Sequence, residues 1–320
     1  GYKKEVVKYM VDGYEKGITP NPDVMCNKEI KFGLFLKKAL EMGADYIATG
    51  HYVRLQRRTM NQELGIKKIK KPSFLIHNSL FIAKDTSKDQ SYFLWTLTQE
   101  QLQYCLFPIG DYIKSDVRKM ARKFKLSNAD KKDSQGICFL GKVGIKDFLG
   151  NYLPTKKGIV VNTEGKIIGE HDGAYFYTIG QRTGLKLGQH EKGEEAKPYY
   201  VAEKDIKENA ILVAKEKDEI LYKKEIEIKN VNFITPITND QLPMTIFARV
   251  RYRQPLVSAL FIIHNSSFKL VFTKPVQFIA SGQSAVFYIK KNRNPSASSL
   301  AGQAGRRSPE LQMLGGGIIS

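Results

Sequence analysis

The sequence predicts an α/β domain with a parallel sheet, followed by a region built from short strands. The chain has 320 residues, enough for two or three domains, and 42% of them are hydrophobic, an ordinary fraction for a folded protein. Up to residue 52 the pattern runs helix, helix, strand and glycine-containing turn, which is typical of an α/β sheet. From 157 to 290, short alternating stretches separated by Gly, Asn and Pro are typical of a β-barrel or sandwich.

The first part of the chain predicts two helices and a buried strand. Residues 2–16 carry apolar side chains at helical spacing. A second helix is expected from about 28 to 42, with an inward face formed by Ile30, Leu34, Phe35 and Leu40. The stretch DYIATGHY, 45–52, is a short buried strand in this interpretation, and ligands of α/β sheets bind at the C-terminal ends of such strands.

The next stretch combines an insertion with two further helices. We expect residues 54–80 to form a basic, irregular insertion. Thr98 and Gln101 have the spacing of a capping box for a short helix, and Cys105 is expected on that helix as a core residue, because unmodified cysteine is among the most buried residue types. Another helix is predicted from Ser115 to about 125.

Two cysteines lie in settings that favour reactivity. Cys26 follows the rigid stretch TPNPDVM close to a predicted helix N-terminus, where the backbone dipole favours a thiolate. Cys138 lies in KKDSQGICFLG, where Lys131 and Lys132 would lower the thiol pKa. Either cysteine alone is a weak candidate, but together they indicate a working thiol pair.

Charge and cysteine usage restrict the function classes. The 51 Lys and Arg residues exceed the 32 Asp and Glu residues by 19. This excess favours a polyanionic partner, most commonly nucleic acid, although a Lys-rich genome bias is an equal alternative. Three cysteines argue for a reducing, cytoplasmic compartment, and their spacing predicts no zinc site. No apolar run is long enough to span a membrane.

The stretch TIFARVRYRQ predicts a strand with an arginine-rich face. Phe247, Arg249, Arg251 and Arg253 would point to one side. This face is either an ordinary solvated face or a surface for phosphates and bases.

Eight ordered motifs resemble those of the tRNA-specific 2-thiouridylases, the MnmA family. They are TPNPDVMCNKEIKFG, GHY, KDQSYFL, DSQGICF, GQRTGL, RYRQ, GQSAVFY and LGGGII. The resemblance implies a nucleotide-binding α/β domain of the PP-loop type (adenine nucleotide hydrolase-like), truncated at its N-terminus, then a small central domain and a C-terminal β-barrel. It assigns 1–103 with 132–145 to the first, 104–131 with 146–212 to the second, and 213–320 to the third.

The resemblance also implies the reaction. Family members use ATP with Mg²⁺ to activate C2 of the wobble uridine of tRNA by adenylating its oxygen, and then replace that oxygen with persulfide sulfur supplied by a cysteine desulfurase or a sulfur-relay protein. Cys138 matches the persulfide carrier, Cys26 the nucleophile that resolves it through a Cys26–Cys138 disulfide, and Asp23 the acid or base.

The remaining site residues follow from the same resemblance. Asn21, Pro22 and Asp23 match the segment that meets the extruded target base, as chemistry on a base requires. Gly50 matches an ATP contact. The tRNA contacts would be His51, Lys88, Asp89, Gln90, Arg251, Tyr252 and Gln283.

The chain departs from the family pattern at two places. The family's SGGxDS phosphate loop is not in this sequence, so we expect this chain to be a fragment that binds ATP weakly and does not thiolate tRNA alone. Residues 292–312 interrupt the stretch between AVFY and LGGGII, and their composition predicts a disordered or foreign insert. The alternative function is a non-catalytic, basic tRNA-binding protein that has lost the ATP loop.

Overall fold

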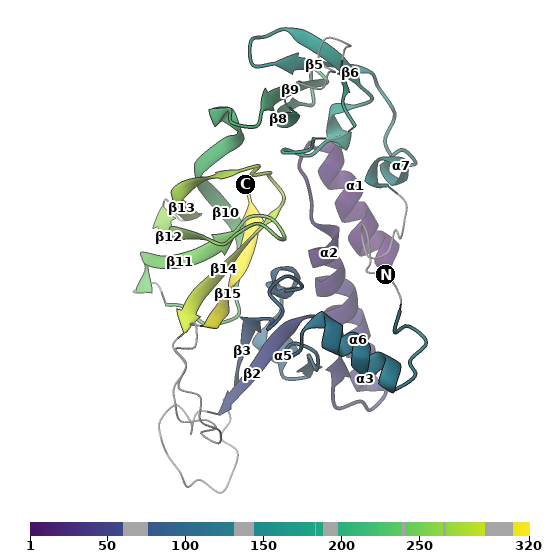
Figure 1. Ribbon diagram of the computed structural model, residues 1–320, viewed down its shortest axis with the longest axis vertical. Helices are drawn as coiled ribbons and strands as arrows, with labels where there is room; N and C mark the ends of the chain where they lie inside the picture. The colour runs from purple at the N-terminus through teal and green to yellow at the C-terminus, as the bar shows by residue number, and fades with distance from the viewer. Residues whose placement is uncertain are drawn as a thin grey trace, which may run out of the picture.

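The computed structural model describes residues 1–59, 76–130, 144–182, 184–187, 198–238, 241–264, 267–291 and 310–320. Figure 1 shows three parts: the N-terminal helices on the right, a small sheet at the top and a barrel on the left. The predicted order, α/β region first and barrel last, is confirmed.

The N-terminal helices differ from expectation mainly in where the second one begins. The first comprises the π-helical turn η1 (Lys3–Val7) and α1 (Lys8–Glu15). The second runs without a break through α2 (Pro22–Met25), η2 (Cys26–Phe35) and α3 (Leu36–Glu41), so it starts at Pro22 and not near residue 28. The cause is local, because the side chain of Asn21 accepts a hydrogen bond from the Val24 amide and Pro22 occupies the first helical position.

The buried face of this helix also differs from the prediction. Phe32 and Leu36 are buried, one turn apart, whereas Leu34 and Phe35 are 51% and 57% exposed. The predicted inward face was therefore wrong for Leu34 and Phe35. Phe32 belongs to the face that meets the parallel strands, where its ring lies 5.8 Å from that of His51.

Two short parallel strands, β1 (Ile47–Ala48) and β4 (Cys105–Leu106), form the sheet of the first domain. A strand forms within the predicted stretch 45–52, but it comprises only the two residues of β1, of which Ile47 is buried and Ala48 is exposed. The capping box of Thr98 that starts α5 (Gln99–Leu102) is confirmed. Cys105 is buried as expected, but it lies on β4 and not on the helix. Since β4 pairs with β1, residues 105 and 106 belong to the first domain and not to the central domain.

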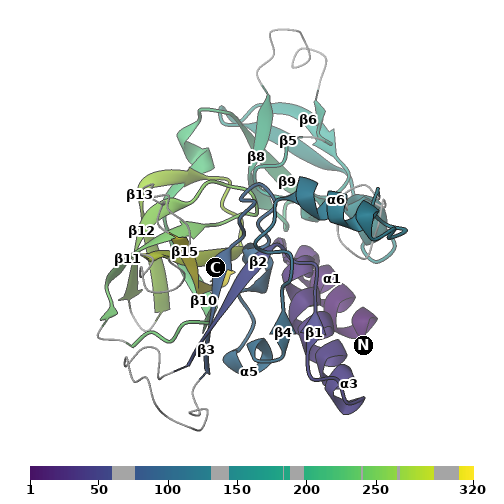
Figure 2. The same ribbon diagram turned by 60° about the horizontal axis from the view of Figure 1, so that its bottom comes forward.

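The expected irregular insertion at 54–80 is a hairpin at its described ends. The strands β2 (Val53–Thr59) and β3 (Ile76–Ile82) pair antiparallel, and residues 60–75 lie outside the described residues. β3 also pairs with β15 of the barrel, so the first and last domains share one sheet (Figure 2). The 3-10 helix η3 (Ser91–Leu94) follows the hairpin.

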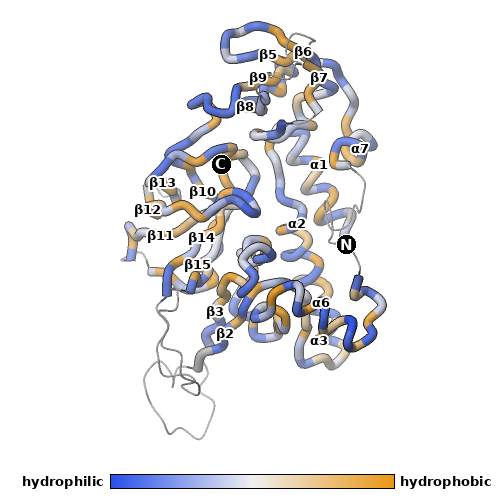
Figure 3. Tube along the Cα trace, viewed as in Figure 1, coloured by the Kyte–Doolittle hydropathy of each residue, from blue (hydrophilic) through white to orange (hydrophobic). Residues whose placement is uncertain are grey.

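Two helices lead from the first domain towards the central one. They are α6 (Lys114–Lys123) and α7 (Ile145–Leu149). Hydrophobic and hydrophilic residues are interspersed along α6, as Figure 3 shows, and none of its residues is fully buried.

The central domain is a five-stranded sheet in the order β7-β6-β5-β9-β8. Its elements are β5 (Gly158–Asn162), β6 (Ile167–His171), η4 (Ala174–Phe176), β7 (Lys186–Leu187), β8 (Tyr199–Asp205) and β9 (Ala210–Lys215). The sheet therefore extends to Lys215, beyond the predicted boundary at 212. Its core packs against α1 through Met10 and Tyr14.

The last domain is a closed barrel in the order β10-β13-β12-β11-β14-β15, with β15 pairing back onto β10. Its elements are η6 (Glu219–Leu221), β10 (Tyr222–Phe233), β11 (Met244–Arg249), β12 (Val257–His264), β13 (Ser267–Gln277), β14 (Ser284–Lys291) and β15 (Glu310–Ile319). Residues 310–312 are ladder residues of β15, so the expected insert 292–312 was placed three residues too far. Residues 292–309 lie outside the described residues.

Candidate active site

The start of the second helix brings three predicted site residues together. Asn21 is its N-cap, Asp23 lies in its first turn and Cys26 follows three residues later. Residues three apart on a helix share a face, so Asp23 and Cys26 lie on one side of the helix start. Cys26 is only 7% exposed, and it sits within the helix and not just ahead of it, where the predicted start near residue 28 placed it.

The barrel contacts this helix start directly. The side-chain oxygen Oε1 of Gln283 lies 3.4 Å from Nδ2 of Asn21. Nε2 of Gln283 donates to the carbonyl oxygens of Thr19 and Pro20, at 3.2 and 3.5 Å. Two predicted site residues, Asn21 and Gln283, are thus brought together from opposite ends of the chain.

Arg251 and Asn21 both lie near the side chain of Tyr92. Burial lowers the pKa of Arg251, and the nearby hydroxyls of Tyr92 and Tyr14 oppose that shift. The Tyr92 hydroxyl donates to the Ser284 carbonyl at 2.9 Å, and burial raises its pKa while Arg251 and Asn21 act in the other direction. Sequence reasoning missed Tyr14 and Tyr92, although Tyr92 lies two residues after Gln90 in the motif KDQSYFL.

Tyr252 and Arg253 continue this surface. The Tyr252 ring lies 4.4 Å from the Phe93 ring, centroid to centroid, and the Arg253 guanidinium lies 5.2 Å from the Tyr252 ring centroid. Both residues are at least partly accessible, unlike Tyr92, which is fully buried.

The predicted arginine-rich strand face does not form. β11 ends at Arg249, and Arg251 and Arg253 lie in the turn that follows. The side chain of Arg249 is 12% exposed and forms an ion pair with Asp89. The predicted strand along TIFARVRYRQ was therefore too long at its C-terminal end, because the backbone bends after Arg249.

Within the KDQ motif, Asp89 points into the protein. Its Oδ1 accepts from the Ala83 amide at 3.1 Å, and its Oδ2 accepts from the Ser91 hydroxyl at 2.9 Å. The side chain of Gln90 accepts a bond from the Tyr52 amide at 3.0 Å. Lys88 and Gln90 remain partly accessible, whereas Asp89 is buried.

Gly50 and His51 follow β1 at the carboxyl end of the parallel strands. Gly50 is exposed, and a side chain added there would meet only the Ile109 side chain, at 4.0 Å. His51 is buried against Phe32, with Nδ1 2.9 Å from the Thr49 hydroxyl. Burial, with a smaller contribution from Lys31, lowers the pKa of His51 to about 3, so the ring is neutral at physiological pH.

The surroundings of Gly50 fit a nucleotide, because its exposed backbone lies where ligands of parallel α/β sheets bind. Among the described residues no group of three His, Cys, Asp or Glu side chains could hold a metal ion. Magnesium is usually bound by one or two carboxylates together with the phosphates of a nucleotide, and not by a dedicated protein cage.

Of the other two cysteines, the structure describes only Cys105. Cys138 lies in the stretch 131–143, outside the described residues, so its pairing with Cys26 remains a prediction. Cys105 is fully buried, its Sγ donates to the Gln101 carbonyl at 3.1 Å, and burial raises its pKa to about 12. The interpretation of Cys105 as a core residue is confirmed.

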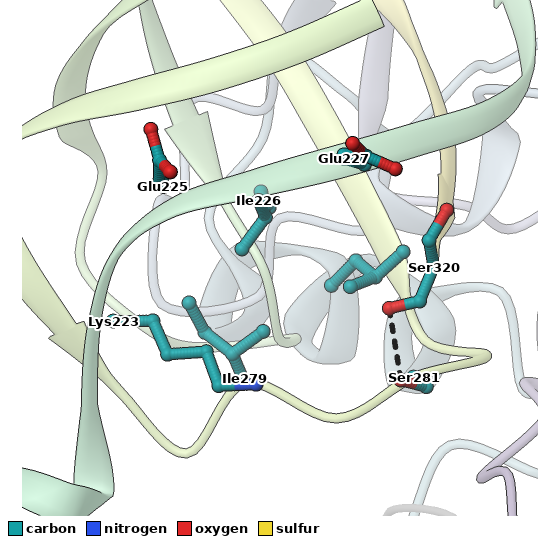
Figure 4. A pocket seen from close by; sticks show the side chains of 8 residues that line it. Lys223, Glu225, Ile226, Glu227, Ile279, Ser281 and Ser320 are labelled. Atoms are coloured by element: carbon teal, nitrogen blue, oxygen red, sulfur yellow. Dashed lines mark hydrogen bonds between the residues drawn. The ribbon is translucent and has the colours of Figure 1, made fainter. Parts of the chain in front are cut away.

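Two surface cavities lie elsewhere. One of about 190 Å³ is at the barrel end, between β10 and the last residues of the chain, as Figure 4 shows. The other, of about 400 Å³, is lined by residues that precede β1 and β4, including Tyr46 and Tyr104, so it lies at the opposite end of these strands from Gly50. Neither cavity contains a predicted site residue.

Comparison with protein families covers all three domains. A family model described as the tRNA methyl transferase HUP domain matches residues 1–142, a tRNA methyl transferase PRC-barrel domain matches 146–215, and an aminomethyltransferase beta-barrel domain matches 223–293. The fold class predicted from the resemblance is therefore confirmed. The first match includes 104–131, in agreement with the pairing of β4 and against the predicted assignment to the central domain. Within the described residues, no helix has both the length and the apolar character needed to cross a membrane.

Curated relatives give the family its name. The tRNA-specific 2-thiouridylase MnmA of Buchnera aphidicola is 44% identical over 293 residues, which are 90% of this chain and 74% of the relative. The tRNA-specific 2-thiouridylase MnmA 1 of Geobacillus kaustophilus is 43% identical, over 90% of this chain and 73% of the relative. The corresponding protein of Legionella pneumophila strain Paris is 41% identical, over 90% and 76%. This chain belongs to the tRNA-specific 2-thiouridylases, a family of sulfurtransferase enzymes.

Proposed function

We propose that this chain carries the thiol pair, Cys26 and Cys138, for the ATP-dependent 2-thiolation of the wobble uridine of tRNA. The observation that supports this most is the helix start at Asn21, which carries an acidic side chain and a cysteine on one face and is held by the barrel. Bound ATP supplies the adenylate that turns the C2 oxygen of the uracil ring into a good leaving group.

The sulfur is then transferred in two steps. The terminal sulfur of a Cys138 persulfide bonds to C2, and AMP leaves with the former C2 oxygen. The Cys26 thiolate attacks Sγ of Cys138, the bond between that Sγ and the transferred sulfur breaks, and the base retains the sulfur as a thiocarbonyl. A Cys26–Cys138 disulfide remains, which an external thiol reduces. Asp23, partly buried one turn before Cys26, accepts or donates the proton that this sequence requires.

The RNA is bound by the surface around the helix start. Lys88, Gln90, Arg251, Tyr252 and Gln283 are the accessible members of the expected set. His51 and Asp89 are buried, so we propose that they support this surface from behind. Asp23, the partly accessible member of the expected base-binding segment, meets the extruded base, and the buried Asn21 and Pro22 hold the backbone that presents it. The persulfide sulfur comes from a cysteine desulfurase or a relay protein.

The test is a thiolation assay with tRNA, ATP, magnesium and a persulfide donor, in which 2-thiouridine is measured by mass spectrometry. It is run on the chain itself and on the chain joined to an SGGxDS-bearing segment of a relative. In the form joined to that segment, we expect Cys26→Ser to abolish 2-thiouridine and the matched variant Cys105→Ser to retain it. Tight tRNA binding without any 2-thiouridine in either form would support the alternative, a non-catalytic tRNA-binding protein.

A further inference from the structure

The turn before β14 holds the segment that precedes the second helix. The Thr19 amide donates to the Ser281 carbonyl at 2.8 Å. Two residues later, the Gln283 amide group contacts Thr19, Pro20 and Asn21, accepting from the last and donating to the carbonyls of the first two. The barrel therefore binds three consecutive residues by both backbone and side-chain hydrogen bonds.

The turn and the segment approach so closely that only glycine fits between them. Gly282 has φ of +88°, and a Cβ atom at this position would lie 2.9 Å from the carbonyl oxygen of Thr19 and 3.2 Å from its amide nitrogen. A side chain here would push Thr19 away from the barrel. The glycine is thus part of the contact and not only of the turn.

The turn is itself fixed by the end of β15. The Gly282 amide donates to the Ile319 carbonyl at 2.9 Å, and the Ile319 amide donates to the Gln283 carbonyl at 2.8 Å. The Ser281 hydroxyl donates to the Ser320 carbonyl at 2.8 Å, the bond drawn in Figure 4. Gln283 consequently projects from a rigid support.

What the turn holds is the beginning of the helix with Asp23 and Cys26. Asn21 caps this helix through its side-chain oxygen, and the other end of the same amide contacts Gln283. Thr19 and Asn21 are 4% and 9% exposed, so their polar groups have little access to water if these bonds are lost. A displacement of this segment would move the helix start as a unit.

We propose that Gln283 is a positioning residue, which fixes the helix start and thereby the place and protection of the Cys26 thiol, in addition to any contact with RNA. The inference deepens the proposed function, because precise placement of Asp23 and Cys26 matters only if they act on a base. A misplacement of about 1 Å can reduce a rate roughly 100-fold.

The first test needs neither tRNA nor ATP. Cys26 is alkylated with iodoacetamide under native conditions, and its rate is followed by peptide mass spectrometry in wild type and in Gln283→Glu. The glutamate keeps the shape and the acceptor but cannot donate to the Thr19 and Pro20 carbonyls. Loss of these bonds should raise the population in which the segment opens, and so the Cys26 alkylation rate, roughly five- to thirty-fold.

Matched measurements separate this local effect from general unfolding. Gln277→Glu makes the same chemical change in the same barrel, but Gln277 bonds to Tyr222 and Glu216 and not to the segment, so it should leave the Cys26 rate within about twofold. Cys105, which is fully buried, reports opening of the whole domain. Gly282→Ala should accelerate Cys26 in the same way as Gln283→Glu.

Two results would overturn the proposal. One is an unchanged Cys26 rate in Gln283→Glu and Gly282→Ala, whether or not tRNA binding falls, since Gln283 would then be an RNA contact only. The other is equal acceleration of the alkylation of Cys26 and Cys105 in both variants, which would mean that the domain unfolds as a whole.

In a thiolation assay, a positioning role of Gln283 predicts a lower kcat with little change in the KM for tRNA, whereas loss of an RNA contact would mainly raise KM. Failure of the thiolation assay alone would count against the proposed function and leave the alkylation result standing.

Discussion

The Arg249 guanidinium lies 3.6 Å from the Asp89 carboxylate, and the two side chains are only 12% and 2% exposed. The pair joins the end of β11 to the KDQ motif of the first domain. Burial raises the pKa of Asp89, while hydrogen bonds from Ala83 and Ser91 and the charge of Arg249 oppose that rise. A charge pair of this kind stabilises the contact only while both partners are present.

Removing one partner of this pair should be costly. We expect Asp89→Leu or Arg249→Met alone to lower the free energy of unfolding by about 3 to 5 kcal/mol, because each leaves a buried charge unpaired. The double variant should recover part of that loss, since two apolar side chains need no counter-charge, whereas the Ala83 amide and the Ser91 hydroxyl still lack the acceptor that Asp89 provided. Urea unfolding of the four proteins measures this, and additive losses in the double variant would contradict it.

His51 should make stability depend on pH. The pKa of His51 is lowered to about 3 in the folded chain, whereas it is about 6.5 in the unfolded chain. Between these two pH values the unfolded chain therefore binds a proton at His51 that the folded chain does not bind. The contribution of His51 to the free energy of unfolding is fully present above about pH 6.5. It falls by roughly 1.4 kcal/mol per pH unit as the pH decreases to about 3. The difference between wild type and His51→Gln in urea unfolding from pH 7 to pH 4 isolates this contribution from that of the carboxylates. A constant difference would show that His51 is not the group responsible.

Cys105 should be chemically inert and structurally important. Its burial and raised pKa predict negligible alkylation in the native state at neutral pH. Cys105→Ser should lower the free energy of unfolding by about 1 to 3 kcal/mol, because burying a hydroxyl costs more desolvation free energy than burying a thiol. Cys105→Ala serves as the comparison, since it removes the polar atom altogether. Rapid labelling of Cys105 in folded protein would contradict this account.

Arg251 should contribute to RNA binding through its charge. It is partly accessible beside Tyr14 and Tyr92, so we expect Arg251→Ala to weaken tRNA binding and to lower the slope of log affinity against log salt by about one. Arg251→Lys keeps the charge and should retain the slope. Binding is measured by fluorescence anisotropy at several salt concentrations, and an unchanged slope in Arg251→Ala would place the RNA elsewhere.

Some features could be predicted because their causes are local. The capping box of Thr98 and Gln101 forms as the spacing indicated, through bonds between residues three apart. The same local chemistry accounts for the helix start at Asn21 and Pro22, an N-cap followed by a first-turn proline, so the prediction of a start near residue 28 missed a local signal. The alternating pattern of the barrel strands predicted that domain, although it placed Arg251 and Arg253 on a strand that ends at Arg249.

The sequence by itself determined the order of the domains, the burial of Cys105 and the grouping of Asn21, Asp23 and Cys26, because these depend on short-range spacing and on apolar patterning. Only the tertiary structure decided that β2 and β3 extend the barrel sheet, that Asp89 turns inward to Arg249, and that Gln283 meets Asn21, 262 residues away. Local propensity carries no information about such partners. They are selected when three domains pack together, because each buried polar group must then find its hydrogen bond on whichever surface faces it.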